Sequence, residues 1–290
     1  MFDPIKFSEI KVPVQRVKFG LFQLDFTGGY RSNDFIVLAA ATGVGKSLLA
    51  LWIAISATEQ GKKVMYIDYE NDASLIEERL VSFGKNYKSA IANNLLKLYT
   101  QSAQEKIIIQ KSFTERNFNL HKFIFDKITA IENAIILHQP NLLVIDVFSC
   151  LYKNIAPTNL TSQLTYILSE SISTIAKKHN CAIIATEQLK NDKIYGRPGE
   201  KDVATGNALT HKATKIITLF SYFKENRART GFATDLSIKL EDFLEVILVK
   251  DRTNDIAEKI YVHKKDIGFH QPNTHEYAAY FDYINNKAFK

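Results

Sequence analysis

Short apolar runs alternate with segments of helical periodicity along most of this chain. Residues 119–138 carry apolar side chains at intervals of about 3.6 residues, which predicts a long amphipathic helix. Apolar runs of roughly four to eight residues, bounded by turn-forming residues, predict buried strands instead. We expect strands over Phe35–Ala39, Lys63–Asp68, Asn141–Val147, Cys181–Thr186, Lys215–Phe220, Phe243–Lys250 and Lys259–His263, with Leu95–Thr100 and Lys106–Gln110 as further candidates.

Helical patterns lie between these strands. One begins at Leu48, and others cover Ser74–Phe83 and Gln163–Asn180. Strands that alternate with helices are typical of a parallel sheet that is covered on both faces. The sequence therefore predicts an α/β fold with a mainly parallel twisted sheet, helices on both faces and an antiparallel edge formed by the last strands.

Composition and charge narrow the class of protein only a little. The 290 residues suffice for one large domain or two small ones, and 46% hydrophobic and 23% charged residues are ordinary for a globular chain. The net charge of +6 is compatible with nucleic acid as a partner but does not require it. Cys150 and Cys181 lie in apolar, strand-like contexts without metal-ligand spacing, which indicates buried residues in a reducing compartment.

No targeting signal is visible in the sequence. The first ten residues lack the layout of a signal peptide, and no run of about 18 apolar residues is long enough to span a membrane. We therefore expect an intracellular, cytoplasmic protein.

The segment Ala40–Ser47 reads Ala-Ala-Thr-Gly-Val-Gly-Lys-Ser and lies between a predicted strand and a predicted helix. That is the context in which a phosphate-binding loop, or P-loop, acts. Gly43 and Gly45 let the backbone N–H groups turn toward phosphate oxygens, and the next helix adds its dipole to the same anion site. Ala40 replaces the first glycine of the usual pattern. The residues expected to bind the nucleotide are Thr42, Gly43, Val44, Gly45, Lys46, Ser47 and Leu48.

Two residue types in this pattern indicate ATP and Mg²⁺ as ligands. Lys46 is expected to reach the β- and γ-phosphates, and the Ser47 hydroxyl to hold Mg²⁺. Ligands of such sheets bind at the carboxyl ends of strands, and Asp146 ends the apolar run Leu142–Ile145. We expect Asp146 to be the Walker B carboxylate that orients Mg²⁺ through water. The alternative is an aspartate that only caps the turn after its strand.

A candidate general base follows the strand Lys63–Asp68. Glu70 lies just past its end, where a carboxylate can polarise the water that attacks the γ-phosphate. Asp68 and Asp72 compete for this role. The alternative is that Glu70 is only an exposed glutamate at the start of a helix, without a catalytic role.

Polar groups also follow two later strands. Gln188 is a candidate sensor of the γ-phosphate because its amide can donate to phosphate, although the neighbouring Glu187 weakens the assignment. Lys250 and Arg252 are cations that can neutralise charge on the transferring phosphoryl group. If they point away from their own nucleotide, they can serve the site of a neighbouring subunit. A solvated basic turn is the alternative.

The order of these motifs resembles a known family. Phe-Gly-Leu-Phe-Gln-Leu-Asp and Gly-Gly precede Ala-Ala-x-x-Gly-x-Gly-Lys-Ser, and Tyr-Ile-Asp-Tyr-Glu, Leu-Leu-Val-Ile-Asp, Ala-Thr-Glu-Gln-Leu and Val-Lys-Asp-Arg follow. This order, over about residues 17–265, is similar to the RecA-type motor of DnaB-like hexameric helicases, which commonly carry alanine at the position of Ala40. The resemblance implies that Glu70 is the catalytic base and that Gln188 is the strand-end glutamine. It also implies that Lys250 and Arg252 act across a subunit interface.

The resemblance implies an ATP- and Mg²⁺-dependent hexameric replicative helicase that moves along single-stranded DNA. We expect the primase-docking amino-terminal domain of the family to be missing. We therefore expect a stand-alone motor, as in small viral or plasmid helicases, with a primase or loader as a possible partner. In the family, two loops that line the ring channel hold the DNA, and here they correspond to Phe148–Thr161 and Leu189–Lys212. The expected DNA-binding residues are Lys153, Lys190, Lys193, Arg197, Lys201 and Lys212, with Tyr195 as a stacking ring.

Other interpretations stay open at this point. The DNA-binding segments also fit solvated surface loops. The core fits a strand-exchange recombinase that forms filaments on DNA, or a KaiC-like regulatory ATPase that does not require DNA. We expect an amino-terminal arm over residues 1–18, a RecA-like ATPase domain over residues 19–268 and a carboxy-terminal tail over residues 269–290. Residues 84–118 and the tail carry no function that the sequence indicates.

Overall fold

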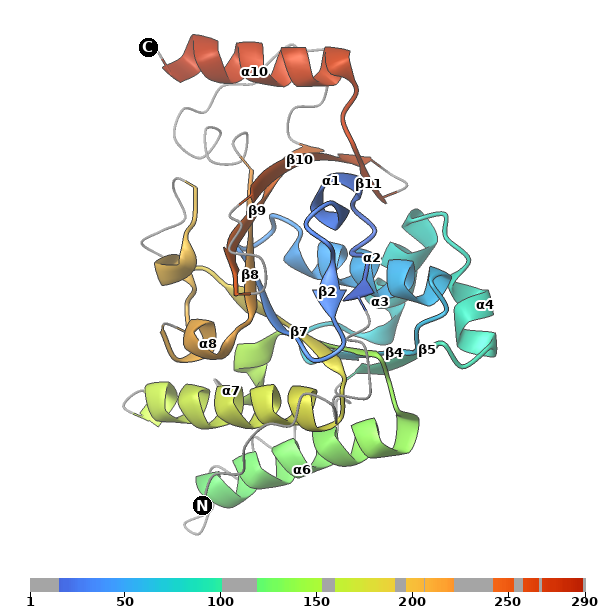
Figure 1. The fold of residues 1–290 in the computed structure, drawn as a ribbon, viewed down its shortest axis with the longest axis vertical. Coiled ribbons are helices and arrows are strands. Elements are labelled where there is room, and N and C mark those ends of the chain that lie inside the picture. Colours follow the sequence, from blue (N-terminus) through green and yellow to red (C-terminus); the bar gives the residue numbers. More distant parts are fainter. Residues whose placement is uncertain are drawn as a thin grey trace, which may run out of the picture.

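Nine strands form the central sheet, in the order β11-β10-β9-β8-β3-β7-β6-β4-β5 (Figure 1). The computed structural model describes residues 16–100, 119–152, 160–190, 197–205, 207–221, 242–252, 258–265 and 268–288. The strands are β3 (Phe35–Ala40), β4 (Val64–Asp68), β5 (Leu96–Thr100), β6 (Leu142–Asp146), β7 (Ala182–Gln188), β8 (Lys215–Phe220), β9 (Phe243–Asp251), β10 (Glu258–Lys265) and β11 (Gly268–His270).

The fold class expected from the sequence is confirmed. Strands β3 to β8 run parallel to one another, whereas β9, β10 and β11 are each antiparallel to the strand before them. The last strands therefore form the predicted antiparallel edge. The candidate strand Lys106–Gln110 lies outside the described residues.

The strand order indicates where a ligand would bind to this sheet. β3 lies between β7 and β8, but the next strand in the chain, β4, lies beyond β6, so the chain crosses two strands after β3. Ligands of open α/β sheets bind at the carboxyl ends of the strands beside such a crossing. β3, which leads into the P-loop, and β6, which ends in Asp146, both finish at this edge.

Helices cover both faces of the sheet (Figure 1). Helix α2 lies on the face that the curved strands β8 to β10 enclose, and α6 and α7 lie on the other face. No helix among the described residues is long and apolar enough to cross a membrane. The helices are α1 (Phe22–Asp25), α2 (Lys46–Glu59), α3 (Ala73–Ser82), α4 (Tyr87–Ala92), α6 (Leu120–His138), α7 (Thr161–Lys178), α8 (Asn207–Lys212) and α10 (Thr274–Ala288), with short 3₁₀ helices η2 (Phe148–Leu151) and η5 (Glu200–Asp202).

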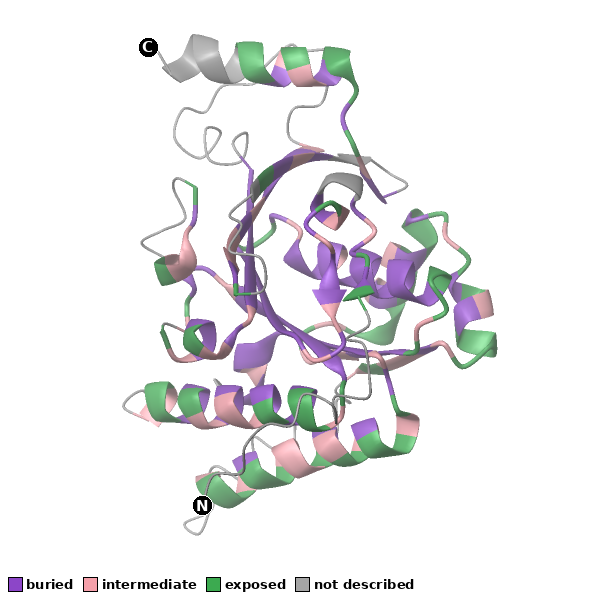
Figure 2. Ribbon diagram, viewed as in Figure 1, coloured by how far each residue is buried: buried purple, intermediate pink, exposed green. Residues whose placement is uncertain are grey.

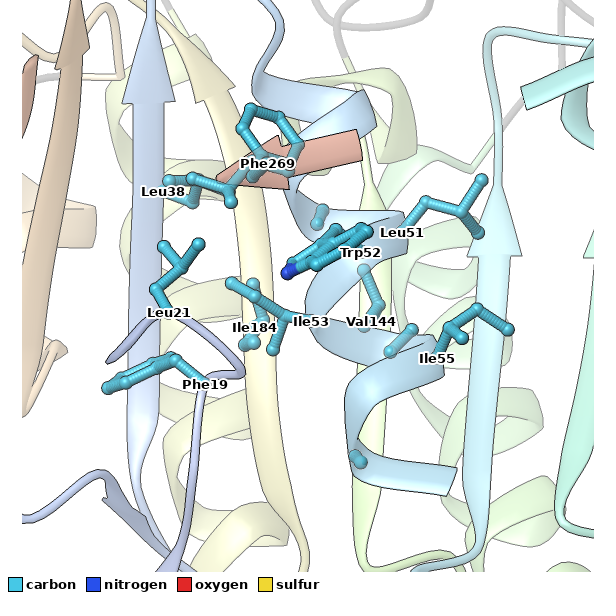
Figure 3. Close-up of a cluster of buried hydrophobic side chains, with 14 of the residues drawn as sticks. Phe19, Leu21, Leu38, Leu51, Trp52, Ile53, Ile55, Val144, Ile184 and Phe269 are labelled. Atoms are coloured by element: carbon cyan, nitrogen blue, oxygen red, sulfur yellow. The ribbon is translucent and has the colours of Figure 1, made fainter. Parts of the chain in front are cut away.

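Helix α2 is buried almost all round, unlike the amphipathic α6 and α7, whose outer faces are exposed (Figure 2). The reason is that α2 contacts β3, β4, β6 and β7 of the sheet and also α4 and β11. Trp52 packs edge-on against Phe269 (Figure 3) and against Phe83. Its Nε1 donates to the carbonyl of Gly20 at 3.0 Å. The helix that follows the P-loop is therefore held rigidly from both sides.

The two ends of the described chain pack on this core. A short hairpin pairs β1 (Arg16–Val17) with β2 (Tyr30–Arg31), and Val17 is buried in the cluster around α2. At the other end, Tyr280 of α10 stacks on Phe243 with ring centroids 5.0 Å apart. Its hydroxyl donates to Glu245 at 3.0 Å.

The segment after β7 contains more regular structure than the sequence indicates. Leu189 forms an antiparallel bridge with Val203, and η5 and α8 follow before β8. Cys150 also differs from its expected context, because it lies in η2 rather than in a strand, whereas Cys181 is fully buried just before β7.

Replacement of Glu132 by glutamine is expected to weaken the packing of α6 against α7. Glu132 accepts from Lys178 Nζ and His179 Nε2, each at 2.8 Å. Hydrogen bonds from His179 and then Lys178 lower the pKa of this carboxyl group. A lowered carboxyl pKa stabilises the fold above the unfolded pKa and loses that contribution as the pH falls through the folded pKa. Thermal melts should show a loss of at most about 1 kcal/mol at pH 6 that disappears in acid.

Candidate functional site

The P-loop joins β3 to α2 at the carboxyl edge of the sheet. Gly43 and Gly45 have φ angles of 77° and 118°, in the region that favours glycine, so the turn requires these residues. Helix α2 begins at Lys46, and its N-cap residue is Gly45, which has no side chain to cap the first turn. The first amides of the helix therefore remain available to an anion, and the helix dipole favours negative charge at the same point.

The first turn of α2 adds a cation and a hydroxyl to this anion site. Lys46 and Ser47 are only 8% and 9% exposed, so both side chains are held within the site. The Ser47 hydroxyl donates to Asp146 Oδ1 at 3.1 Å, which brings the two predicted Mg²⁺-binding residues together. A hydroxyl and a carboxylate are oxygen ligands of the kind that Mg²⁺ takes. The residues at the P-loop thus fit a nucleotide with its magnesium ion.

Asp146 is fully buried at the end of β6, where it accepts hydrogen bonds from three hydroxyl groups. Besides Ser47, Tyr66 of β4 donates to its Oδ2 at 2.8 Å and Thr186 of β7 donates to its Oδ1. Hydrogen bonds compensate the cost of burying a charge and fix the orientation of the carboxylate. The neighbouring strands therefore hold Asp146 in place from both sides.

The three acidic residues at and just after the end of β4 differ in what they contact. Asp72 caps α3 by accepting from the N–H of Leu75 at 3.0 Å. Asp68 is fully buried and accepts from the backbone N–H groups of Glu70 and Asn71, each at 2.8 Å. Both carboxylates are thus engaged in shaping the turn.

Glu70 is the member of this group that faces the P-loop. Its side chain is 48% exposed, and its Oε2 lies 3.7 Å from Lys46 Nζ. Burial raises the pKa of Asp68, and the charge of Asp146 raises it further, because Asp68 and Asp146 pair across β4 and β6. The more solvated Glu70 is therefore the group best placed to meet a water beside a bound phosphate.

Gln188 lies at the carboxyl end of β7 and pairs in register with Ala40, the last residue of β3. The sequence predicts its position at a strand end, and the structure adds that this strand is the neighbour of the strand that leads into the P-loop. Its neighbour Glu187 is buried and turns to the other face of the sheet, where it accepts from Ser149 of η2.

Lys250 and Arg252 lie at the end of the sheet where the parallel strands begin, whereas the P-loop lies at the end where those strands finish. β9 runs antiparallel to β8, so its carboxyl end meets the start of β8 and β3. The N–H of Arg252 donates to the carbonyl of Thr214, whose own N–H donates to Phe35 at the start of β3. Five residues of strand, about 16 Å, separate that level from Ala40. These cations therefore cannot reach the phosphates bound by their own P-loop.

Local contacts hold both cations at this edge. Lys250 Nζ lies 3.0 Å from Glu200 Oε1 and donates to the carbonyl of Thr210 at 2.7 Å. Arg252 is exposed, and its Nη2 donates to the carbonyl of His211.

The predicted DNA-binding residues fall into three groups. Lys153 and Lys193, with Tyr195, lie outside the described residues. Lys201 is exposed, and Lys190 Nζ donates to the carbonyl of Lys201 at 2.6 Å. The other two are engaged in ion pairs: Arg197 binds the buried Glu245 at 2.6 and 2.9 Å, and Lys212 pairs with Glu170.

Sequence reasoning did not find Tyr66 and Thr186 as partners of Asp146. Both are hydroxyl residues within apolar strand patterns, and this is the only signal that the sequence offers. Their strands flank β6 in the sheet, so their role follows from the strand order.

The P-loop, the strand-end carboxylate and the mainly parallel sheet with an antiparallel edge together define a RecA-like ATPase domain. A family model described as DnaB-like helicase C terminal domain matches residues 17–270, and the chain belongs to that family.

Individual relatives and a solved structure are similar to this chain at low identity. A probable replicative DNA helicase of Trieres chinensis is 22% identical over 271 residues, which cover 87% of this chain and 56% of that protein. The chain thus spans little more than half the length of that helicase. The DNA repair and recombination protein RadB of Methanococcus maripaludis is 27% identical over 197 residues, covering 66% of this chain and 79% of RadB. The crystal structure of a KaiC-like protein of Pyrococcus horikoshii matches the fold with a TM-score of 0.63 at 17% identity, covering 90% of this chain and all of that one.

Proposed function

We propose that this protein hydrolyses ATP and uses the energy to move along single-stranded DNA as a hexameric ring helicase. The observation that supports this most is the position of Lys250 and Arg252. They lie about 16 Å, measured along the strands, from the end of the sheet that carries their own P-loop. In a head-to-tail ring, the end of the sheet that carries these cations meets the nucleotide of the next subunit. Membership in the DnaB-like helicase family supports the same arrangement.

Each residue of the site then has a task at the phosphates. The P-loop amides and Lys46 hold the β- and γ-phosphates, and Glu70 orients the attacking water and takes its proton. Ser47 and Asp146 would hold Mg²⁺, which when bound neutralises charge on the phosphate oxygens. The hydroxyl groups around Asp146 keep its carboxylate turned toward Ser47.

The remaining groups complete the site from other elements. Gln188 reads the presence of the γ-phosphate from the strand beside the P-loop. Lys250 and Arg252 of the neighbouring subunit stabilise the charge that develops on the transferring phosphoryl group. Their local contacts with Glu200 and with the carbonyls of α8 have to open when they reach that subunit.

Replacement of Glu70 by glutamine is expected to leave ATP binding intact and to lower kcat by about 10²–10⁴-fold. Glutamine keeps the size of the side chain but cannot accept the proton of water. Pre-steady-state hydrolysis and binding of a fluorescent ATP analogue separate the two effects. An Asp72→Asn variant, which changes a carboxylate of the same turn, should hydrolyse ATP at the normal rate. Normal turnover in the Glu70 variant would move the role of base elsewhere.

The DNA-binding part of the proposal depends on the segment after β7. Lys190 and Lys201 are the described cations of this segment that are not bound to a carboxylate, so we propose that they contact the DNA backbone. Arg197 and Lys212 are left out of the proposed contacts because each already neutralises a carboxylate. Lys153 and Lys193 stay predictions.

Strand exchange is the second candidate function. The similarity to RadB, a DNA repair and recombination protein, favours it, because the match covers 79% of RadB but only 56% of the helicase. Joint-molecule formation without unwinding would support this candidate over the helicase.

The steady-state ATPase rate with and without single-stranded DNA tests the proposed function. We expect several-fold stimulation at about 50 mM salt and much less at about 200 mM, because binding to phosphates releases counterions. A Lys201→Gln variant should need more DNA for half-maximal stimulation. The matched control is Lys177→Gln, an exposed lysine near the carboxyl end of α7, away from the P-loop edge. A brisk ATPase that ignores DNA at both salt concentrations would contradict the motor and favour a regulatory ATPase.

A further inference from the structure

Glu187 is a buried carboxylate that the proposed catalytic steps do not use. It is 1% exposed, near the carboxyl end of β7 and directly before Gln188. Burying a charged group costs free energy unless hydrogen bonds or opposite charges compensate it. The contacts of this carboxylate therefore have to be both numerous and well aligned.

Its hydrogen bonds join two segments of the site. Glu187 Oε2 accepts from the N–H of Ser149 at 3.0 Å, and Oε1 accepts from the Ser149 hydroxyl at 3.0 Å. Oε1 also accepts from the backbone N–H of Gln188 at 2.9 Å. One carboxylate thus connects the backbone of the proposed γ-phosphate sensor to η2, the turn that begins two residues after Asp146.

This connection lies where the sheet itself no longer joins β6 to β7. The paired register of the two strands ends at Ile145 and Ala185, so the carboxylate of Glu187 continues the link beyond the last paired residues. Within η2, Phe148 and Leu151 are buried in the core. Glu187 therefore connects the backbone of Gln188 to a turn whose apolar side chains are packed in the core.

Electrostatics place η2 within the field of the active site. Burial raises the pKa of the Cys150 thiol to about 11, and the charges of Glu70 and Glu187 contribute to the rise. Charges of the candidate site therefore act on a side chain of η2.

We propose that Glu187 is a positioning residue whose hydrogen bonds connect Gln188 to η2. Through this connection, exchange or hydrolysis of the nucleotide at the P-loop would change the conformation of the segment after Asp146. This inference rests on the proposed function, in which Gln188 contacts the γ-phosphate. The segment after η2 is one of the two proposed DNA-binding loops, so the hydrogen bonds of Glu187 would couple ATP hydrolysis to DNA binding.

Hydrogen–deuterium exchange of residues 147–152 tests this coupling, because the N–H of Ser149 is itself one of the donors. In the unaltered protein, a non-hydrolysable ATP analogue should slow exchange in this peptide. In Glu187→Ala the peptide should exchange about tenfold faster without the analogue, since a hydrogen bond to a charged group is lost, and the analogue should no longer slow its exchange. Binding of a fluorescent ATP analogue should change by less than about threefold, and kcat should fall more than KM rises.

Two further variants keep the test decisive. Ser149→Ala removes only the hydroxyl contact and leaves all charges in place, so it should give a smaller loss of the nucleotide effect even if Glu187→Ala folds poorly. Glu132→Ala removes a carboxylate between α6 and α7 and should leave exchange in residues 147–152 unchanged. A nucleotide effect of normal size in Glu187→Ala would overturn the inference.

The result can be separated from the fate of the proposed function. Loss of the nucleotide effect in Glu187→Ala, together with an ATPase that ignores DNA, would support the coupling and contradict the motor. DNA-stimulated hydrolysis of normal size in Glu187→Ala, with a normal nucleotide effect on exchange, would support the motor and contradict the coupling. Failure of the unaltered protein to bind the analogue would overturn both.

Discussion

Replacement of Lys46 by alanine is expected to lower kcat for ATP hydrolysis by about 10²–10³-fold, equivalent to about 3–4 kcal/mol of transition-state stabilisation. Lys46 is only 8% exposed in the first turn of α2, so its ammonium group is already fixed within the site. Such a group needs little reorganisation to meet the γ-phosphate. Its loss also leaves Glu70 without the cation that lies 3.7 Å away in the structure.

The measurement is the steady-state rate of phosphate release at saturating ATP, with thermal melting to show that the fold is retained. Lys63→Ala is the matched control, because Lys63 is exposed and lies before β4, at the edge away from the P-loop. Unchanged turnover in Lys46→Ala would contradict the assignment of Ala40–Ser47 as a nucleotide-binding P-loop.

Replacement of Arg252 by alanine is expected to leave ATP bound but to reduce hydrolysis by about 10³-fold or more, the usual effect of losing an arginine that acts across an interface. The reason lies in the direction of β9. Its antiparallel course carries Arg252 to the level of Phe35, whereas the nucleotide site begins after Ala40. An arginine at that position has no route to its own γ-phosphate.

A mixture of two inactive variants tests whether Arg252 acts in trans. Lys46→Ala subunits supply an intact Arg252, and Arg252→Ala subunits supply an intact P-loop. In randomly mixed rings at equal concentrations, about one quarter of the interfaces combine the two intact halves. ATPase activity should therefore reappear on mixing. Mixed assemblies that form but stay inactive would remove the trans-acting role, and full activity of Arg252→Ala alone would do so as well.

Residues of the candidate site whose roles depend on local sequence could be predicted well. The P-loop glycines, Lys46 and Ser47 lie within one strand–turn–helix segment, and the structure has the strand and the helix on either side of it. Asp146 could be placed at a strand end because the apolar run before it marks a buried strand. The structure brings Ser47 and Asp146 to within one hydrogen bond of each other.

The partners of these residues could not be predicted in the same way. Tyr66 and Thr186 meet Asp146 because β4 and β7 flank β6, and 80 and 40 residues separate them from it in the chain. Arg197 is a cation in a polar segment, yet it pairs with the buried Glu245 that lies 48 residues away. No spacing within the sequence reveals such pairs.

The sequence by itself determined the α/β class, the antiparallel edge, the P-loop and the strand-end position of Asp146. These features follow from hydrophobic periodicity and from short-range turn chemistry, which act within about 20 residues. The tertiary structure decided the strand order, the hydroxyl groups around Asp146 and the engagement of Arg197 and Lys212 in ion pairs. It also decided that Lys250 and Arg252 lie where the parallel strands begin, at the end of the sheet away from the P-loop. The physical reason is that strand order and direction are fixed by burial of both sheet faces, to which residues far apart in the chain contribute together.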